Sequence, residues 1–294
     1  MPEGHTIHAL ADRLDAAFRG TPVAFSSPQG RFAASAALID GRPVRGAEAH
    51  GKHLAIHVAG DRVVHVHLGL FGRFSVRRHR RADRGVPPED LPVAGQVRLR
   101  MVSRTHVGDL RGPIVCELVS PQEWSEVRAG LGADPLRGQV LPEEVLDRLH
   151  RTRRAIGAVL LDQTVVAGVG NVYRAELLHR HAVDPHTPAR RVPDEVVRLL
   201  WDDLVRLMPL GVRTGRIIVA DEDVERAQAL LDAGRTGRIR PAYAVYRRHG
   251  RPCPRCATTV VKETMAGRNL FWCPGCQDAD DRAHPRPWQA AASP

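Results

Sequence analysis

The first pattern along the chain is an amphipathic helix close to its start. In residues 5–19, HTIHALADRLDAAFR, apolar residues recur every three or four positions, as they do on one face of an α-helix. These positions are Ile7, Leu10, Ala11, Leu14 and Phe18. The spacing predicts a helix with one buried face, only a few residues behind the chain terminus.

After this helix the pattern changes to short apolar segments that are typical of β-strands. Gly, Pro and Asp turns separate these segments, and many carry β-branched residues. The pattern predicts an antiparallel β-sandwich of about 120 residues. The segments are RFAASAAL, HLAIHVAG, RVVHVHLG, GRFSVRR, QVRLRMV and PIVCELV.

From Ser120 onwards the spacing of apolar residues is helical. Ser120, with Pro121 after it and Glu123 three positions on, is the pattern of a capped helix start. Helical spacing continues through EEVLDRLH, AIGAVLLDQ, NVYRAELLHRH and DEVVRLLWDDLVRLM, which predicts a helical domain of about 115 residues.

The sequence thus predicts a multidomain protein of the α+β class. Its predicted parts are a β-sandwich with an N-terminal helix (1–120), a helical domain (121–236), a basic linker with a cysteine module (237–277) and a disordered tail (278–294).

The net charge of the chain indicates what kind of partner it binds. The chain has 43 Lys and Arg against 33 Asp and Glu, a net charge of +10, and Lys52 and Lys262 are its only lysines. Such a surface favours nucleic acid as partner, or it is a solvated, arginine-rich surface without one. No apolar run reaches about 18 residues, and no secretory signal pattern is present. We therefore expect no membrane partner and a cytoplasmic location.

Four of the five cysteines form a metal-binding pattern near the end of the chain. Cys253 and Cys256 are separated by two residues, as are Cys273 and Cys276, and ATTVVKETMAGRNLFW between the pairs suits a β-hairpin. This spacing predicts one structural Zn²⁺ held by four thiolates, with no open position for catalysis. The fifth, Cys116, lies in an apolar strand segment, where it acts as a small buried residue.

A glycine turn between two helical segments is a further candidate site. In LLDQTVVAGVGNVYRAELL (160–178), Gly168 and Gly170 precede Asn171, which we expect to cap the following helix. Backbone amides gathered at such a turn can bind a phosphate. An ordinary helix-capping turn remains the alternative. Because no strand precedes the glycines, the pattern argues against a dinucleotide-binding fingerprint, and we expect no nucleotide cofactor.

Four motifs in this order resemble the Fpg/Nei family of DNA glycosylase/AP lyases. They are Pro2-Glu3-Gly4, Gly51-Lys52-His53-Leu54, the stretch from Gln163 to Glu176, and VYRRHGRPCPRC with GRNLFWCPGC. The resemblance covers about residues 2–277, and it is stronger to the endonuclease VIII branch of actinobacterial type. It implies a β-sandwich, a helix–two-turn–helix domain and a zinc-finger hairpin.

The resemblance also implies a catalytic group at the chain terminus. Removal of Met1 would leave Pro2 with a free amine, which in the family attacks C1′ of the damaged nucleotide. Glu3 would act as the general acid and base, and Lys52 would contact phosphate and assist base release. Terminal amines have a pKa of about 8, against about 10.4 for lysine, so Pro2 suits this role at neutral pH.

The same resemblance implies a set of DNA contacts. The turn with Gly168, Gly170 and Asn171 would bind one phosphate, and Arg268 on the zinc-finger hairpin would bind another. Leu70 and Phe71, in HLGLFGRF, would fill the gap that the extruded nucleotide leaves in the duplex. Packing of these two residues in the sandwich core is the alternative.

Two departures from the family matter for function. Thr6 occupies a position where many family members carry a second glutamate, and it cannot relay a proton as that residue does. In addition, no segment of the helical domain can be assigned as the loop that selects the base. His65 and His67 alternate on a strand, and we interpret them as strand residues and not as metal ligands.

The resemblance therefore implies a bifunctional DNA glycosylase/AP lyase of base excision repair that removes oxidised bases, chiefly pyrimidines. We expect a monomer whose partner is damaged DNA in the bacterial nucleoid. A non-catalytic DNA-binding protein of the same fold would not need Pro2 and Glu3. An RNA-binding zinc-ribbon protein would leave the N-terminal motif unexplained.

Overall fold

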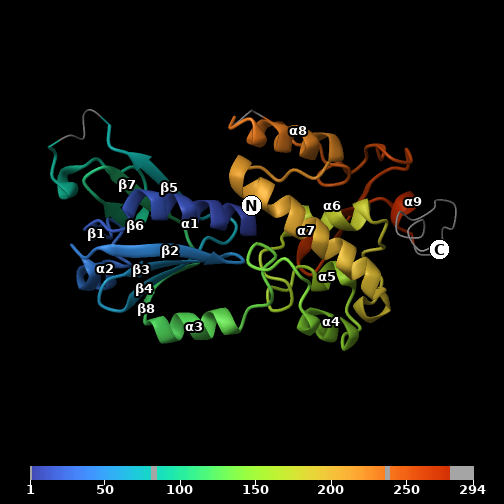
Figure 1. The fold of residues 1–294 in the computed structure, drawn as a ribbon, viewed down its shortest axis with the longest axis horizontal. Coiled ribbons are helices and arrows are strands. Elements are labelled where there is room, and N and C mark those ends of the chain that lie inside the picture. Colours follow the sequence, from blue (N-terminus) through green and yellow to red (C-terminus); the bar gives the residue numbers. More distant parts are fainter. Residues whose placement is uncertain (1, 81–84, 236–238, 279–294) are drawn as a thin grey trace. The chain divides into compact units, whose positions relative to one another are not determined.

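The computed structural model describes residues 2–80, 85–235 and 239–278. The chain forms two compact units, residues 1–130 and 131–294, and each is considered by itself (Figure 1). The predicted disordered tail, apart from Asp278, lies outside the described residues. Within them, no helix is both long enough and apolar enough to cross a membrane.

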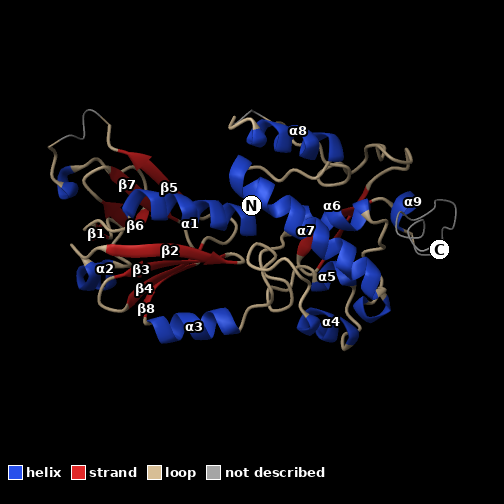
Figure 2. Ribbon diagram, viewed as in Figure 1, coloured by secondary structure: helices blue, strands red, loops and turns tan. Residues whose placement is uncertain are grey.

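The first unit contains two four-stranded antiparallel sheets, whose strands are red in Figure 2. One sheet has the strand order β1 (Ala24–Ser26), β6 (Val97–Val102), β7 (His106–Arg111) and β5 (Arg73–Arg78). The other has the order β2 (Val44–His50), β3 (His53–Val58), β4 (Arg62–His67) and β8 (Val115–Val119). The sandwich prediction is confirmed, although the sequence pattern did not reveal β1, β2 and β7.

Helix α1 (Gly4–Phe18) contacts strands of both sheets, β2 and β3 on one side and β5 and β7 on the other. Its predicted apolar face is buried together with the inner faces of the sheets. Leu10 and Leu14 are each 1% exposed and Phe18 is fully buried. This packing holds the start of the chain against the sheets, because apolar burial stabilises the helix in one orientation.

The segment RFAASAAL is predicted to be a strand, but its residues from Ala33 onwards belong to the short helix α2 (Ala33–Ile39). Four alanines within it explain the difference, since alanine has the highest intrinsic helix propensity. Ala36 and Ile39 are its buried residues.

Helix α3 (Pro121–Ala129) begins with the predicted capping box. The Ser120 hydroxyl accepts from Glu123 N (3.2 Å), and the Glu123 carboxylate accepts from Ser120 N (2.7 Å). Trp124, the buried residue of this helix, packs with Ala55 and Val63 of the sheet. Helix α3 is therefore part of the first compact unit.

The second unit is helical around one apolar core. The longest described helix, α7, carries Pro209 and is followed by Gly215 as its C-cap, whose φ of 69° is left-handed. The helices of this core are α4 (Glu143–His150), α5 (Ile156–Val159), α6 (Asn171–Arg180), α7 (Asp194–Thr214) and α8 (Asp221–Asp232). A 3₁₀ turn lies at Ala189–Arg191, and another lies in the first unit at Pro88–Asp90.

The cysteine module is the last described part of the second unit. Strands β9 (Val261–Met265) and β10 (Arg268–Trp272) form the predicted hairpin, which the one-turn helix α9 (Pro274–Gln277) follows. A small apolar cluster connects the module to α6, because Ala175 of that helix packs with Val245, Val260 and Phe271.

Candidate active site and metal centre

The N-terminal motif lies at the start of α1. Glu3 is the N-cap residue, and its backbone carbonyl accepts from Thr6 N at 2.8 Å and Ile7 N at 3.4 Å. The Glu3 carboxyl group is fully buried, whereas Pro2 is partly exposed. The positive end of a helix dipole favours a carboxylate in this position. A buried carboxyl group beside the partly exposed Pro2 is a suitable arrangement for proton transfer.

Pro2 lines a hollow of about 320 Å³ on the surface of the first unit. Leucine, phenylalanine and valine side chains form its apolar part, and Thr6 and Ser75 add hydroxyl groups. The charged side chains among its described lining residues are Arg13 and Arg73. The full lining is Pro2, Thr6, Leu10, Arg13, Leu68, Gly72, Arg73, Phe74, Ser75 and Val76. The hollow therefore offers hydrogen-bond donors and positive charge next to the chain terminus.

Lys52 lies in the two-residue turn between β2 and β3. Gly51 takes the left-handed φ of 54° that this tight turn requires, and His50 pairs with His53 across it. His53 in turn pairs with His67, the last residue of β4. This register brings the Lys52 turn beside the loop that follows His67.

Burial favours the neutral form of His53, His65 and His67, which lie near Lys52. The rings of His53 and His65 are hydrogen-bonded, with Nδ1 and Nε2 2.9 Å apart, and His65 also packs on Trp124. Burial, followed by the nearby His67, His65, His50 and Lys52, lowers the pKa of His53 to about 3. Burial also lowers the pKa values of His65 and His67.

Leu70 and Phe71 project from a tight turn after β4. Gly72 N donates to Leu68 O at 3.0 Å, and a Cβ atom on Gly72 would lie 2.2 Å from the same oxygen. Leu70 is 45% exposed and Phe71 is 92% exposed. The alternative that both pack in the sandwich core therefore does not apply. Because Leu68 and Gly72 also line the hollow at Pro2, the turn, the hollow and Lys52 lie at one end of the first unit.

The glycine turn of the second unit is closed by Gln163. Its side-chain carbonyl accepts from Gly168 N at 2.9 Å, and its amide donates to Leu161 O and Val169 O at 2.9 and 3.0 Å. Gly168 has a φ of 93°, a left-handed value that favours glycine. Gln163 thereby fixes the backbone directly before helix α6.

Asn171 is not the N-cap that the sequence predicts. Gly170 occupies that position, and Asn171 is the first helical residue, only 5% exposed. Its side-chain amide donates to Asn269 O of the zinc-finger hairpin at 2.7 Å, and its carbonyl accepts from Arg174. Tertiary packing therefore determines the role of this side chain, which joins the glycine turn to the hairpin that carries Arg268.

Two buried charged residues of α6, Arg174 and Glu176, were missed by sequence reasoning. Arg174 donates to Asn269 O (3.1 Å), Gly157 O (3.3 Å) and Met265 O (3.4 Å). Glu176 accepts from three successive amides, those of residues 244–246, at 2.7 to 3.0 Å. Burial raises the pKa of Glu176, while these three amides oppose that shift.

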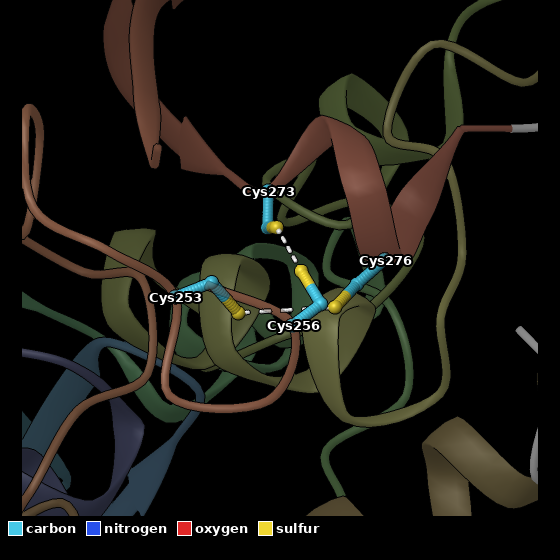
Figure 3. Close-up of side chains that lie close together, drawn as sticks. All are labelled: Cys253, Cys256, Cys273 and Cys276. Carbon is cyan, nitrogen blue, oxygen red and sulfur yellow. Dashed lines mark hydrogen bonds between the residues drawn. The ribbon is translucent and has the colours of Figure 1, made fainter. Parts of the chain in front are cut away.

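The four cysteines converge as their spacing predicts (Figure 3). The Sγ atoms of Cys253 and Cys276 are 3.8 Å apart and those of Cys256 and Cys273 are 3.4 Å apart. Tetrahedral Zn²⁺ with Zn–S bonds of about 2.3 Å requires sulfur atoms about 3.8 Å apart, so this donor set fits zinc. Within the described part of the chain, these cysteines form the one cluster of potential metal ligands. The site is a structural zinc centre, because protein atoms fill all four positions.

Comparison with known protein families matches three segments of the chain. Residues 1–112 match the formamidopyrimidine-DNA glycosylase N-terminal domain, and residues 131–223 match its H2TH domain. Residues 250–279 match the zinc finger found in FPG and IleRS.

Individual relatives cover nearly the whole chain. Endonuclease 8 1 of Mycobacterium tuberculosis is 49% identical over 279 residues, which are 94% of this chain and 100% of the relative. Endonuclease 8 of Escherichia coli is 29% identical, again over 94% of this chain and 100% of the relative.

Solved structures show the same fold. Lactococcus lactis formamidopyrimidine-DNA glycosylase bound to DNA with an AP site superimposes with a TM-score of 0.73 at 19% identity, over 94% of this chain and 99% of that one. MutM in complex with DNA containing carbocyclic 8-oxo-G superimposes with a TM-score of 0.75 at 21% identity, over 94% of this chain and 100% of that one. With the matched domains and the 49% identical relative, this places the chain in the Fpg/Nei family of base-excision-repair DNA glycosylases.

Proposed function

We propose that this protein is a bifunctional DNA glycosylase/AP lyase that removes oxidised bases, chiefly pyrimidines, through a Schiff base on Pro2. The observation that carries the proposal is the position of Pro2 at the edge of a hollow, directly beside the fully buried Glu3. Its substrate would be damaged DNA, bound by a monomer without a nucleotide cofactor. The complexes of its structural relatives with AP-site and 8-oxo-G DNA support this class of substrate.

The chemistry begins with the amine of Pro2, once Met1 has been removed. A terminal amine with a pKa of about 8 is neutral in about one molecule in ten at pH 7, without further tuning. The nitrogen attacks C1′, the bond from C1′ to the base breaks, and the leaving base takes up the proton that the Pro2 nitrogen loses as the new bond forms. Glu3 then protonates the sugar ring oxygen as the C1′–O bond opens, which leaves an iminium link between Pro2 and C1′.

The lyase steps follow from this iminium link. It acidifies the hydrogens on C2′, so loss of a C2′ proton expels the 3′ phosphate and cleaves the strand. A second elimination expels the 5′ phosphate, and water then hydrolyses the link to regenerate the amine. Glu3 is the buried group beside Pro2 that can carry these protons.

We assign the DNA contacts by the family resemblance and the geometry of each unit. In the first unit, Lys52 would bind a phosphate, and the exposed Leu70 and Phe71 would fill the gap in the duplex. In the second unit, the turn of Gly168 and Gly170 would bind another phosphate through Asn171, whose side-chain amide has a second N–H, while the Gly168 amide stays bonded to Gln163 and fixes the turn. Arg268 would bind a phosphate from the hairpin that Asn171 contacts.

Borohydride trapping on DNA with one abasic site tests the proposal. Borohydride reduces the iminium link to a stable covalent adduct, which we expect from the wild-type protein and not from the P2A variant. Intact mass must first confirm that Met1 is absent, since Met1 would block the nucleophile. Tight binding by a wild-type protein that lacks Met1 but forms no adduct would identify a non-catalytic DNA-binding protein. Abasic RNA, tested in parallel, would reveal an RNA substrate.

A further inference from the structure

Helix α6 makes hydrogen bonds to the cysteine module and to the linker before it. Nine of its ten residues are buried. Arg174 and Glu176 bond to the hairpin and to the linker before it. At the C-terminal end, Arg255 of the first cysteine pair donates to His179 O at 2.9 Å and to Arg180 O at 3.2 Å. The end of the helix is thus fixed against the metal site.

The side chain of His179 reaches one of the four sulfur atoms directly. Its Nε2 atom lies 3.3 Å from Cys253 Sγ, and the residue is only 2% exposed. The same sulfur lies 3.4 Å from Arg255 N, a backbone donor of the cysteine turn itself. His179 is therefore a side chain from outside the cysteine module that bonds to a predicted zinc ligand.

The chemistry of the pair determines the direction of this hydrogen bond. A zinc-bound thiolate has no proton, so it accepts, and the imidazole must carry its proton on Nε2. A donor of this kind withdraws charge from the sulfur and fixes its orientation. Filling of space does not explain the residue, because an apolar side chain would do so without the cost of burying an imidazole.

We propose that His179 is a positioning residue of the zinc centre, which donates from Nε2 to the Cys253 thiolate. The metal site then includes helix α6 as well as the cysteine module. Retention of zinc then depends on the packing of α6 against the cysteine module. Loss of zinc in turn releases the C-terminal end of that helix. The proposal does not depend on glycosylase activity.

Zinc release tests this coupling on the full-length, zinc-loaded protein. H179F fills the space without a donor, and H179Q keeps an N–H donor. H181F is the matched control, because His181 lies at the same helix end but bonds to Asp203 at 2.8 Å. In excess chelator we expect zinc release from H179F at least about 10-fold faster than from wild type, with H179Q between them and H181F unchanged. Equal rates for H179F and H181F would overturn the proposal.

Spectroscopy separates a hydrogen bond to sulfur from a general loosening of the fold. In cobalt-substituted protein, the thiolate-to-metal charge-transfer band should shift in H179F, because the sulfur loses its donor, and remain in place in H181F. If H179F does not fold, an NMR measurement on the wild-type protein tests the hydrogen bond instead. With ¹⁵N-labelled histidine and ¹¹³Cd in the site, His179 Nε2 should carry a proton and couple to the metal. An unprotonated Nε2 would contradict the proposal.

Discussion

Glu3 has a carboxyl group that is entirely buried, at the end of a helix that the sheets hold in place. Acidic side chains are seldom fully buried in proteins. If Glu3 were exposed to solvent, Pro2 and Glu3 would look like any other chain end. Its burial beside the hollow makes Glu3 the residue on which proton transfer depends in the proposed mechanism.

The E3Q variant should separate base release from Schiff-base formation. Glutamine keeps the size of the side chain but cannot protonate the sugar ring, so release of a damaged base should fall by about 10²-fold or more. Borohydride trapping on a pre-formed abasic site should fall less, because the base is already absent. Excision measured by gel, with the melting temperature as a control for folding, checks this. Wild-type excision by E3Q would exclude Glu3 as the acid.

Phe71 provides a second prediction about a single residue. Because it is 92% exposed, the F71A variant should keep the stability of the wild type. Its binding to duplex DNA with an abasic site should weaken about 10-fold, since the gap in the stack is no longer filled. Binding to single-stranded abasic DNA, which has no such gap, is the internal control. Equal losses on both substrates would argue against this role.

At the scale of elements, the hairpin of β3 and β4 brings the histidines and Lys52 together. Residues 53 and 65 are 12 positions apart in the sequence, yet their rings are bonded because the register aligns the strands. His67 belongs to the same group, and its Nδ1 accepts from Gly69 N at 3.1 Å at the start of the Leu70 turn. The neutral histidines thus support both turns that carry proposed DNA contacts.

This hairpin should lose stability in acid. The pKa of His53 is about 3 in the folded protein, against 6.5 for the unperturbed residue, so the unfolded chain binds more protons between these values. His53 therefore stabilises the fold fully above pH 6.5, and that contribution decreases as the pH falls from 6.5 towards 3. The groups that face it are His50, Lys52, His65 and His67.

The H53Q variant tests the contribution because glutamine does not titrate in this range. Its free energy of unfolding, measured by urea denaturation from pH 8 to 5, should fall less steeply than that of the wild type. The difference in slope should reach at most about 1.4 kcal/mol per pH unit. Acid effects at the zinc site cancel in this comparison, since both proteins contain it. Parallel curves would show that His53 does not carry the effect.

At the scale of the whole molecule, the net charge of +10 predicts salt-dependent binding to DNA. Each phosphate that the protein neutralises releases counterions, and affinity falls as salt rises. The charge is carried almost wholly by arginine, which suits bidentate phosphate contacts. On the zinc-finger hairpin, we assign one such contact to Arg268.

The R268A variant should weaken binding to all DNA sequences alike. A plot of log affinity against log salt should become less steep by about one unit, as expected for loss of one phosphate contact. R151A is a suitable control, because Arg151 is exposed at the end of α4 and pairs with Asp147. Fluorescence anisotropy from low to high salt provides the slopes. An unchanged slope for R268A would exclude it as a phosphate contact.

The sequence by itself determined the features that depend on local pattern. The apolar face of α1, the capping box of α3 and the spacing of the cysteines each act within a few neighbouring residues, so they can be recognised without a fold. Alanine-rich α2 was mistaken for a strand because a short apolar run suits either structure.

Only the tertiary structure decided which distant side chains meet. Burial of Glu3, exposure of Phe71 and the bond of Asn171 to the hairpin depend on packing between segments far apart in the chain. His179 belongs to the same class: it lies 74 residues from Cys253, and only the docking of α6 brings them into contact. Such contacts leave no periodic signal in the sequence, because strand register and helix packing, and not residue spacing, determine them.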